Sequence, residues 1–203
     1  MKFCRIYATL PQTYVLGPYL RFALWVQGCK RNCDGCMSPD SIPLNGGNLL
    51  IIKDLADEII KDTQTEGITI SGGEPFLQAE AMVNLIKTIR KNRDFGVIVY
   101  TGYKLDELTN DSSANQNQDN KEFLKHIDLL IDGPYIKSLN DGINMRGSSN
   151  QEIHLLTKRY ESIFWEYYMK NQRSVEVHML KKEVFLAGIP GACMLSKWKD
   201  KFR

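Results

Sequence analysis

Apolar and polar positions alternate along the first two-thirds of the chain in a way that predicts strands and helices in turn. Short apolar runs, each ending at a polar or glycine residue, predict buried strands at "LRFALWV" (20–26), "GITIS" (67–71), "GVIVYTG" (96–102) and "DLLIDG" (128–133). Apolar residues at helical spacing predict amphipathic helices at "LLIIKDLADEII" (49–60) and "LQAEAMVNLIKTIRKN" (77–92). Strands that alternate with helices favour an α/β fold with a mainly parallel sheet.

A polar stretch interrupts the next helical region. Helical spacing is present over 104–108 and again over 121–127, on either side of "NDSSANQNQDN" (110–120). The stretch has no apolar periodicity, and it therefore predicts a solvated loop inside the domain.

The last quarter of the chain has a different pattern. "TKRYESIFWEYYMKN" (157–171) predicts a helix with an aromatic side, and "SVEVHML" (174–180) with "EVFLAGIPG" (183–191) predicts a β-hairpin. We therefore expect a core over residues 1–156 and a small α/β appendage over 157–203. The basic end "KWKDKFR" (197–203) predicts a solvated tail.

The residues best suited to chemistry follow the predicted strands. They are the cysteine loop "GCKRNCDGCM" (28–37), Gly72-Gly73-Glu74, Thr101-Gly102-Tyr103 and Asp132-Gly133. The carboxyl ends of parallel strands lie at one edge of a sheet, and ligand sites collect there. The pattern therefore predicts one site assembled from four loops.

Composition and charge narrow the class of protein only a little. The chain has 203 residues, which suits one domain or one domain with an appendage, and its net charge of +2 is too small to favour nucleic acid or a membrane as partner. No apolar run approaches the roughly 20 residues that span a bilayer. The first residues lack the apolar segment of a signal peptide, so we expect a cytoplasmic, reducing location.

The cysteines carry the strongest chemical signal. Three of the five form Cys29-x-x-x-Cys33-x-x-Cys36. Disulfides are rare in a reducing compartment, and four-iron clusters and structural zinc normally take four protein ligands. Three thiols therefore suggest a four-iron cluster with one iron open to another ligand. A zinc site completed by Cys4, Cys193 or His178, and chemically inert thiols, are the alternatives.

The turn at 70–76, "ISGGEPF", has a second possible role in binding. Gly72 and Gly73 let a ligand approach the backbone closely, and the carboxylate of Glu74 can accept hydrogen bonds from an ammonium group. Such a turn is also a common connection between a strand and a helix. By itself it does not establish a site.

The two motifs together resemble the radical S-adenosylmethionine (radical SAM) superfamily. The resemblance extends over about residues 15–155 and includes "VYTGY" (99–103), "LLIDGPYI" (129–136) and "MRGSSNQ" (145–151). The last two stretches resemble the activating proteins of anaerobic ribonucleoside-triphosphate reductase, which are close to the pyruvate formate-lyase activating enzymes. This resemblance implies an incomplete (β/α) barrel of five or six mainly parallel strands.

The resemblance also implies roles for individual residues. Cys29, Cys33 and Cys36 would bind three irons of a [4Fe–4S] cluster, and the fourth iron would bind the amino and carboxylate groups of S-adenosylmethionine. The other implied cofactor contacts are Gly72, Gly73 and Glu74 for the ammonium group, Thr101 and Asp132 for the carboxylate or ribose, and Arg146 and Asn150 for the carboxylate.

One position departs from the family pattern. Many members have an aromatic residue beside the adenine just before the third cysteine, where this chain has Gly35. Met37 or Tyr103 would then supply the adenine contact.

The resemblance implies reductive cleavage of S-adenosylmethionine to a 5′-deoxyadenosyl radical, which installs a glycyl radical on a partner enzyme such as an anaerobic ribonucleotide reductase. Flavodoxin or ferredoxin would supply the electron. The alternatives are a radical SAM enzyme that modifies a peptide or small molecule directly, and a non-catalytic metal-binding module that docks a partner.

Overall fold

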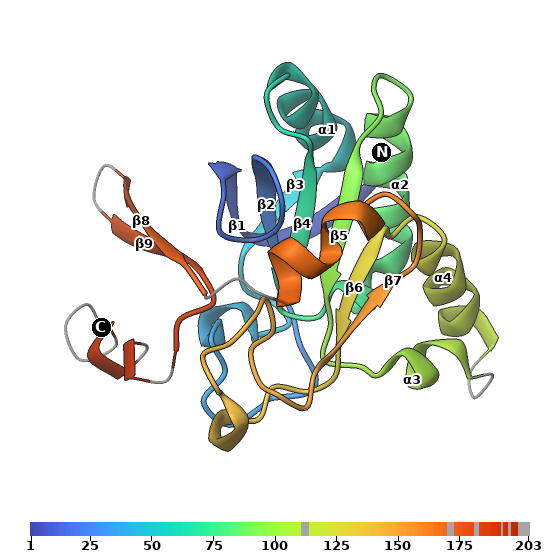
Figure 1. The fold of residues 1–203 in the computed structure, drawn as a ribbon. Helices are drawn as coiled ribbons and strands as arrows, with labels where there is room; N and C mark the ends of the chain where they lie inside the picture. The colour runs from blue at the N-terminus through green and yellow to red at the C-terminus, as the bar shows by residue number, and fades with distance from the viewer. Residues whose placement is uncertain (111–113, 170–172, 181–182, 192, 195, 199–203) are drawn as a thin grey trace.

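The computed structural model describes residues 1–110, 114–169, 173–180, 183–191, 193–194 and 196–198. Within them, seven strands form one sheet in the order β3-β1-β2-β4-β5-β6-β7 (Figure 1). The strands are β1 (Phe3–Thr13), β2 (Arg21–Val26), β3 (Asn48–Ile51), β4 (Gly67–Gly72), β5 (Gly96–Tyr100), β6 (Leu129–Asp132) and β7 (Glu152–Leu155). Strands β2, β4, β5 and β6 are parallel, and β1, β3 and β7 are antiparallel to their neighbours. The fold is therefore α/β with a mainly parallel centre.

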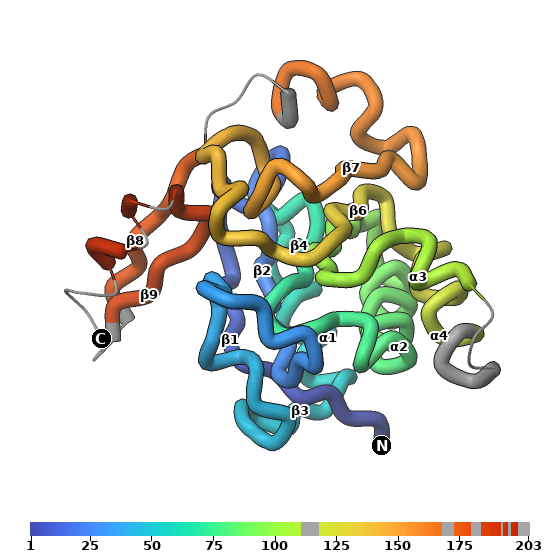
Figure 2. Tube along the Cα trace, turned by 90° about the horizontal axis from the view of Figure 1, so that it is seen from below, coloured from blue at the N-terminus to red at the C-terminus, as the bar shows by residue number. Residues whose placement is uncertain are grey.

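Helices cover one face of this sheet (Figures 1 and 2). The α-helices are α1 (Ile52–Lys61), α2 (Ala79–Arg90), α3 (Leu105–Thr109) and α4 (Ala114–Leu124). Short helical turns lie at Pro39–Ser41, Pro75–Gln78, Lys137–Leu139, Glu161–Ile163 and Trp165–Met169. Leu24, Ile70 and Val99 of the sheet pack with Leu55 of α1 and Ile86 of α2 in one apolar cluster, so burial of this face fixes the helices on it.

The C-terminal segment covers the opposite face. Trp25, Ile98 and Ile131 of the sheet pack there with Tyr160 and Ala187. The hairpin of β8 (Val175–Leu180) and β9 (Glu183–Gly188) forms a separate two-stranded sheet, as the alternating pattern predicts. In Figure 2 it lies beside β1 and β2, away from α1 and α2.

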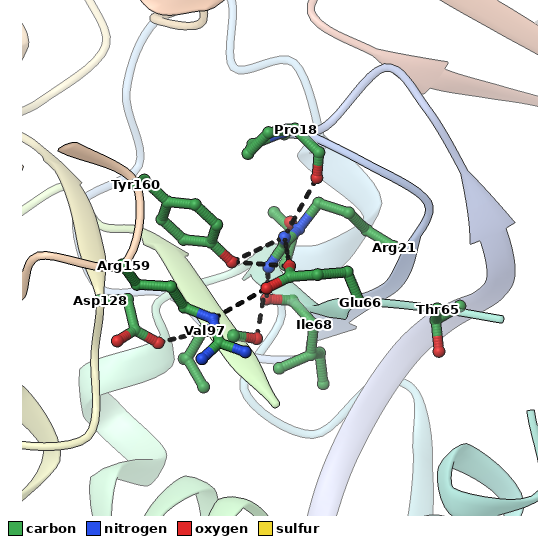
Figure 3. A network of polar contacts seen from close by, with 12 residues as sticks. Pro18, Arg21, Thr65, Glu66, Ile68, Val97, Asp128, Arg159 and Tyr160 are labelled. Atoms are coloured by element: carbon green, nitrogen blue, oxygen red, sulfur yellow. Dashed lines mark hydrogen bonds and ion pairs between the residues drawn. The ribbon is translucent and has the colours of Figure 1, made fainter. Parts of the chain in front are cut away.

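A buried network of charges joins the C-terminal segment to the amino ends of the parallel strands (Figure 3). The side chain of Arg21 is fully buried; it donates to Glu66 at 2.7 Å, to Thr69 at 2.7 Å and to the hydroxyl of Tyr160 at 2.9 Å. Glu66 also pairs with Arg159 at 2.8 Å. The network lies at the edge of the sheet opposite the carboxyl ends of the strands.

Two elements at the sheet edge differ from the sequence prediction. Strand β1 was not predicted, and residues 49–51, predicted as helix, form β3 instead. Leu49 and Leu50 pair with Arg5 and Cys4 of β1, and α1 starts only at Ile52. Pairing between these strands outweighs the helical spacing, because it satisfies the backbone groups of an edge that would otherwise lack partners.

One other prediction was wrong, and another was confirmed only in part. Residues 114–120, predicted as loop, belong to α4, whose Phe123 is fully buried against Phe76 with ring centroids 4.9 Å apart. This anchor holds a helix that has little amphipathic character of its own. The helix predicted over 157–171 is confirmed in part: residues 161–169 are helical, with short turns at Glu161–Ile163 and Trp165–Met169, whereas 157–160 are not helical and 170–171 lie outside the described part of the chain. The predicted solvated tail also lies mainly outside it, since residues 199–203 are not described.

Candidate functional site

A cavity of about 730 Å³ lies at the carboxyl ends of the parallel strands. Its walls include residues that follow each of these strands: Cys29, Cys33 and Cys36 after β2, Gly73 and Glu74 after β4, Thr101 and Gly102 after β5, and Gly133 after β6. The four loops of the sequence prediction therefore meet at one cavity.

Backbone hydrogen bonds hold the cysteine loop over this cavity. The amide of Gly28 donates to Ser41 O at 2.8 Å, and that of Cys29 donates to Ile42 O at 2.9 Å. Gly35 has a φ of +69°, and a Cβ at this position would lie 2.8 Å from Cδ of Lys137. The positive φ thus explains why a glycine stands where an aromatic residue would be expected, since the flexible Lys137 side chain could move aside.

All three loop cysteines are thiols and none is in a disulfide. The amide of Arg31 donates to Sγ of Cys29 at 3.4 Å. Burial raises the pKa of Cys29, while hydrogen bonds from the amides of Arg31 and Asn32 lower it. Metal coordination deprotonates a thiol, so a bound cluster would keep Cys29 as the thiolate that burial alone disfavours.

The arrangement fits an iron–sulfur cluster better than a single zinc ion. Within the described part of the chain, no three His, Cys, Asp or Glu side chains converge on one metal position. A zinc ion needs such convergence, whereas thiolates of a four-iron cluster bind separate iron atoms. The candidates for a fourth zinc ligand do not line the cavity: Cys4 is buried in the helix-side core, Cys193 is exposed, and His178 lies 3.0 Å from Glu176.

Glu74 connects the glycine turn to the loop after β5. It is buried, and its carboxylate accepts from Thr101 Oγ1 at 2.7 Å, from Gly102 N at 2.9 Å and from Phe76 N at 3.1 Å. Burial raises the pKa of Glu74 to about 7, although these donors and the charge of Arg31 lower it. The carboxylate therefore changes its charge near neutral pH.

Glu74→Gln is expected to weaken binding of S-adenosylmethionine to the cluster-loaded protein about 5- to 150-fold, or about 1–3 kcal/mol, because a charge-assisted hydrogen bond is lost. The wild-type affinity should also fall as the pH drops below about 7, where Glu74 becomes neutral, and the variant should lack this dependence. Anaerobic calorimetric titration at several pH values measures both effects. Equal affinities and equal pH dependence in the two proteins would exclude Glu74 as a ligand contact.

The glycine turn is packed directly against the start of the cysteine loop. The amide of Glu74 donates to Gly28 O at 2.8 Å, and a Cβ on Gly73 would lie 2.3 Å from the same oxygen. Side chains cannot relieve a clash between two backbone segments, so only a glycine lets these loops meet.

Gly73→Ala is expected to separate the two loops, to destabilise the protein by about 1–3 kcal/mol and to reduce iron incorporation. Gly102→Ala is the control, because its Cβ would meet the flexible Cδ of Arg31 at 3.1 Å rather than backbone. Thermal unfolding and iron analysis measure the difference. Equal iron incorporation by both variants would show that Gly73 is not needed for the two loops to meet.

The other predicted contacts separate into two groups. Thr101 lies on the cavity wall, whereas Tyr103, Asp132, Arg146 and Asn150 are not among the described residues that line it. The ring of Tyr103 is 4.5 Å from the guanidinium carbon of Arg31, whose Nη2 pairs with Glu107. Tyr103 therefore contacts the cysteine loop through Arg31.

Asp132, Arg146 and Asn150 have local partners. Asp132 accepts from Leu105 N at 2.6 Å, Arg146 pairs with Asp141 at 3.3 Å, and Asn150 donates to Pro134 O at 2.8 Å. These bonds fix the loops beside the cavity, and a direct ligand contact from any of the three stays untested.

Several cavity residues were not selected from the sequence. Gln151 donates to Gly133 O at 2.7 Å and accepts from Gly147 N at 2.7 Å, so it ties two wall segments together. It belongs to the "MRGSSNQ" stretch, which could have indicated it. Met37, which was predicted together with Tyr103 for the adenine contact, lines the cavity, whereas Tyr103 does not; the contact itself stays a prediction.

The sequence of this chain is similar to a family model and to several known proteins. Residues 15–154 match the family model described as a 4Fe-4S single cluster domain. An anaerobic ribonucleoside-triphosphate reductase-activating protein from Haemophilus influenzae is 36% identical over 71% of this chain and 93% of its own length. Its counterpart in Escherichia coli is 33% identical over 72% of this chain and 95% of its own length. A pyruvate formate-lyase-activating enzyme from Clostridium pasteurianum is 28% identical over 63% of this chain and 50% of its own length.

Proposed function

Because the chain belongs to the family of anaerobic ribonucleoside-triphosphate reductase-activating proteins, we propose that it installs a glycyl radical on a partner ribonucleotide reductase. It is a radical SAM enzyme with a [4Fe–4S] cluster and S-adenosylmethionine as cofactors. The single observation that carries the proposal is that the three cysteines and the Gly73-Glu74 turn line one cavity.

The residues of the cavity have separate roles in this proposal. Cys29, Cys33 and Cys36 would hold the cluster, while Glu74 and the backbone of Gly72 and Gly73 would receive the ammonium group of S-adenosylmethionine. When bound, the cluster would supply the electron for cleavage of S-adenosylmethionine, which would provide the chemistry that abstracts a hydrogen atom from the Cα of a glycine. The protein binds and orients these groups and excludes water, so no side chain needs to act as a general base.

The glycine to be activated belongs to another protein, so the cavity must admit a segment of polypeptide. We propose that the sheet is an incomplete (β/α) barrel whose open side admits it. The sheet has one apolar cluster on each face. The helix-side cluster fixes the scaffold, and residues of the other cluster, including Trp25 and Phe185, line the cavity.

We also propose how the chain is divided into a core and an extension, and which proteins supply its electrons. Residues 1–156 would form the catalytic core and 157–203 an extension, in keeping with a family match that ends at residue 154. A flavodoxin or ferredoxin would reduce the cluster in the cytoplasm. No helix in the described residues is long and apolar enough to cross a membrane.

Anaerobic reconstitution with iron and sulfide, followed by reduction, tests the proposal. We expect about four irons and four sulfides per chain and formation of 5′-deoxyadenosine, increased by the partner reductase. Zinc without sulfide would instead indicate a non-catalytic metal module. 5′-Deoxyadenosine formed together with a modified small molecule would indicate direct modification.

A further inference from the structure

The hairpin of β8 and β9 has two faces of different composition. Opposed pairs in an antiparallel hairpin share a face, and the register pairs Met179 with Val184, Val177 with Leu186 and Val175 with Gly188. The other face carries Glu176, His178, Phe185 and Ala187. One face is thus apolar at all six positions, and the other is mixed.

The mixed face attaches the hairpin to the rest of the protein. Phe185 packs edge-on against Trp25 with centroids 5.0 Å apart, and Ala187 is fully buried. Glu176 accepts from Thr13 Oγ1 at 2.7 Å and from Tyr14 N at 3.0 Å. These contacts fix which face of the hairpin points away from the core.

A buried arginine also anchors the chain just before β8. The side chain of Arg173 is only 4% exposed; its Nε donates to Asn144 O at 3.2 Å, and its other nitrogens bind Asn140 and Arg146. The hairpin is therefore tied to the loop of residues 140–146 as well as to β1 and β2. Its position is set before any partner binds.

The outer half of the apolar face is exposed, its inner residues Val175, Leu186 and Gly188 are half-buried, and the face reaches the cavity. Val177 is 56% exposed, Met179 85% and Val184 37%. Val184, Leu186 and Gly188 also line the cavity that contains the three cysteines. A contiguous exposed apolar surface on a soluble domain marks an interaction site, and this one starts at the cavity itself.

We propose that this apolar face, formed by Val175, Val177, Met179, Val184, Leu186 and Gly188, is the docking surface for the partner glycyl radical enzyme. The inference rests on the proposed function, in which a backbone glycine of a second protein must enter the cavity. When that glycine is in the cavity, the surrounding surface of the partner contacts the residues at the border of the cavity. The hairpin is part of this border. The exposed backbone edges of a two-stranded hairpin offer the partner hydrogen bonds as well.

The hairpin lies outside the residues that match the family model, which end at 154. The relatives from Haemophilus influenzae and Escherichia coli are matched over nearly their whole length by 71% and 72% of this chain. The proposed docking surface is therefore an addition to the part of the chain that the family model matches.

Met179→Asp and Val177→Asp test the surface. We expect each to weaken binding of the partner reductase at least tenfold and to raise the reductase concentration needed for half-maximal glycyl radical formation similarly. Cleavage of S-adenosylmethionine without the reductase should stay at the wild-type rate. Leu49→Asp is the matched control, because Leu49 is 57% exposed on β3 and does not line the cavity.

The outcomes separate the docking surface from the function. Unchanged reductase affinity in both variants overturns the docking surface. Lower thermal stability of the two variants with unchanged affinity for the reductase also overturns the docking surface. The apolar face would then be covered by another part of this chain. A wild-type dimer in sedimentation that Met179→Asp dissociates, with reductase affinity intact, assigns the face to a second copy and overturns it too. Failure of the proposed function is distinct: the wild-type protein would then bind the reductase without forming any glycyl radical.

Discussion

Cys33→Ala is expected to abolish the [4Fe–4S] cluster and all cleavage of S-adenosylmethionine. Cys33 lies between Cys29 and Cys36 on the cavity wall, and no other cysteine lines that wall in the described part of the chain. A cluster left with two protein ligands has two irons exposed to solvent and is lost on purification. Iron and sulfide analysis after anaerobic reconstitution, with chromatography for 5′-deoxyadenosine, measures both losses.

Cys193→Ala is the control for this experiment. Cys193 is exposed and does not line the cavity, so its removal should leave about four irons, about four sulfides and full cleavage activity. Full iron and sulfide content in Cys33→Ala would mean that the ligands are assigned wrongly. Loss of the cluster in both variants would point to Cys193 as a ligand.

Arg21→Ala is expected to lower the free energy of unfolding by about 3–5 kcal/mol, because the carboxylate of Glu66 loses a fully buried partner. Thr69, the hydroxyl of Tyr160 and the carbonyls of Ile68 and Gly96 lose a hydrogen-bond donor as well. For a chain of this size we expect the unfolding midpoint to fall by about 6–20 °C. Urea and thermal unfolding of the cluster-free protein measure the change.

Lys53→Ala is the control, because it breaks an exposed ion pair instead of a buried one. Lys53 and Asp57 lie on the surface of α1, with side chains 79% and 49% exposed, so the loss should be about 0.5 kcal/mol or less. An effect of Arg21→Ala below about 1 kcal/mol would show that the network does not stabilise the fold. Because the network lies at the opposite edge of the sheet, Arg21→Ala should still bind S-adenosylmethionine at temperatures well below its midpoint.

The parallel strands at the centre of the fold, and the loops at their carboxyl ends, could be predicted from the sequence. Burial on both faces of the sheet gives these strands continuous apolar runs. Every residue of β2 is buried, and its apolar run is correspondingly continuous. The antiparallel edge could not be predicted in the same way. In β1 the buried residues Cys4, Ile6 and Leu10 are separated by half-exposed ones, and a bulge breaks the register with β2.

For the predicted site residues, the sequence indicates where they lie along a strand but not the direction of their side chains. Asp132 ends β6 as predicted, yet it shares a side of the strand with Leu130, which belongs to the helix-side cluster, whereas Ile131 faces the other way. Strand alternation thus directs Asp132 toward α3, where it binds Leu105 N. Position at a strand end could be read from the sequence, but this direction could not.

Contributions from distant segments were also beyond prediction. Arg21 occupies a buried strand position because Glu66 and Tyr160 meet it there, and no local pattern indicates that meeting. The cavity wall formed by Val184, Leu186 and Gly188 likewise depends on how the hairpin packs on Trp25. Such contacts arise from tertiary packing and leave no periodic signal in the sequence.

Electron paramagnetic resonance of the partner reductase tests the central claim most directly. After anaerobic incubation with the reduced, cluster-loaded protein and S-adenosylmethionine, the reductase should show a glycyl radical doublet. The doublet should collapse when the reductase carries glycine deuterated at Cα. Turnover of S-adenosylmethionine with no such doublet on the reductase, or on any other candidate glycyl radical enzyme from the same organism, would contradict the account.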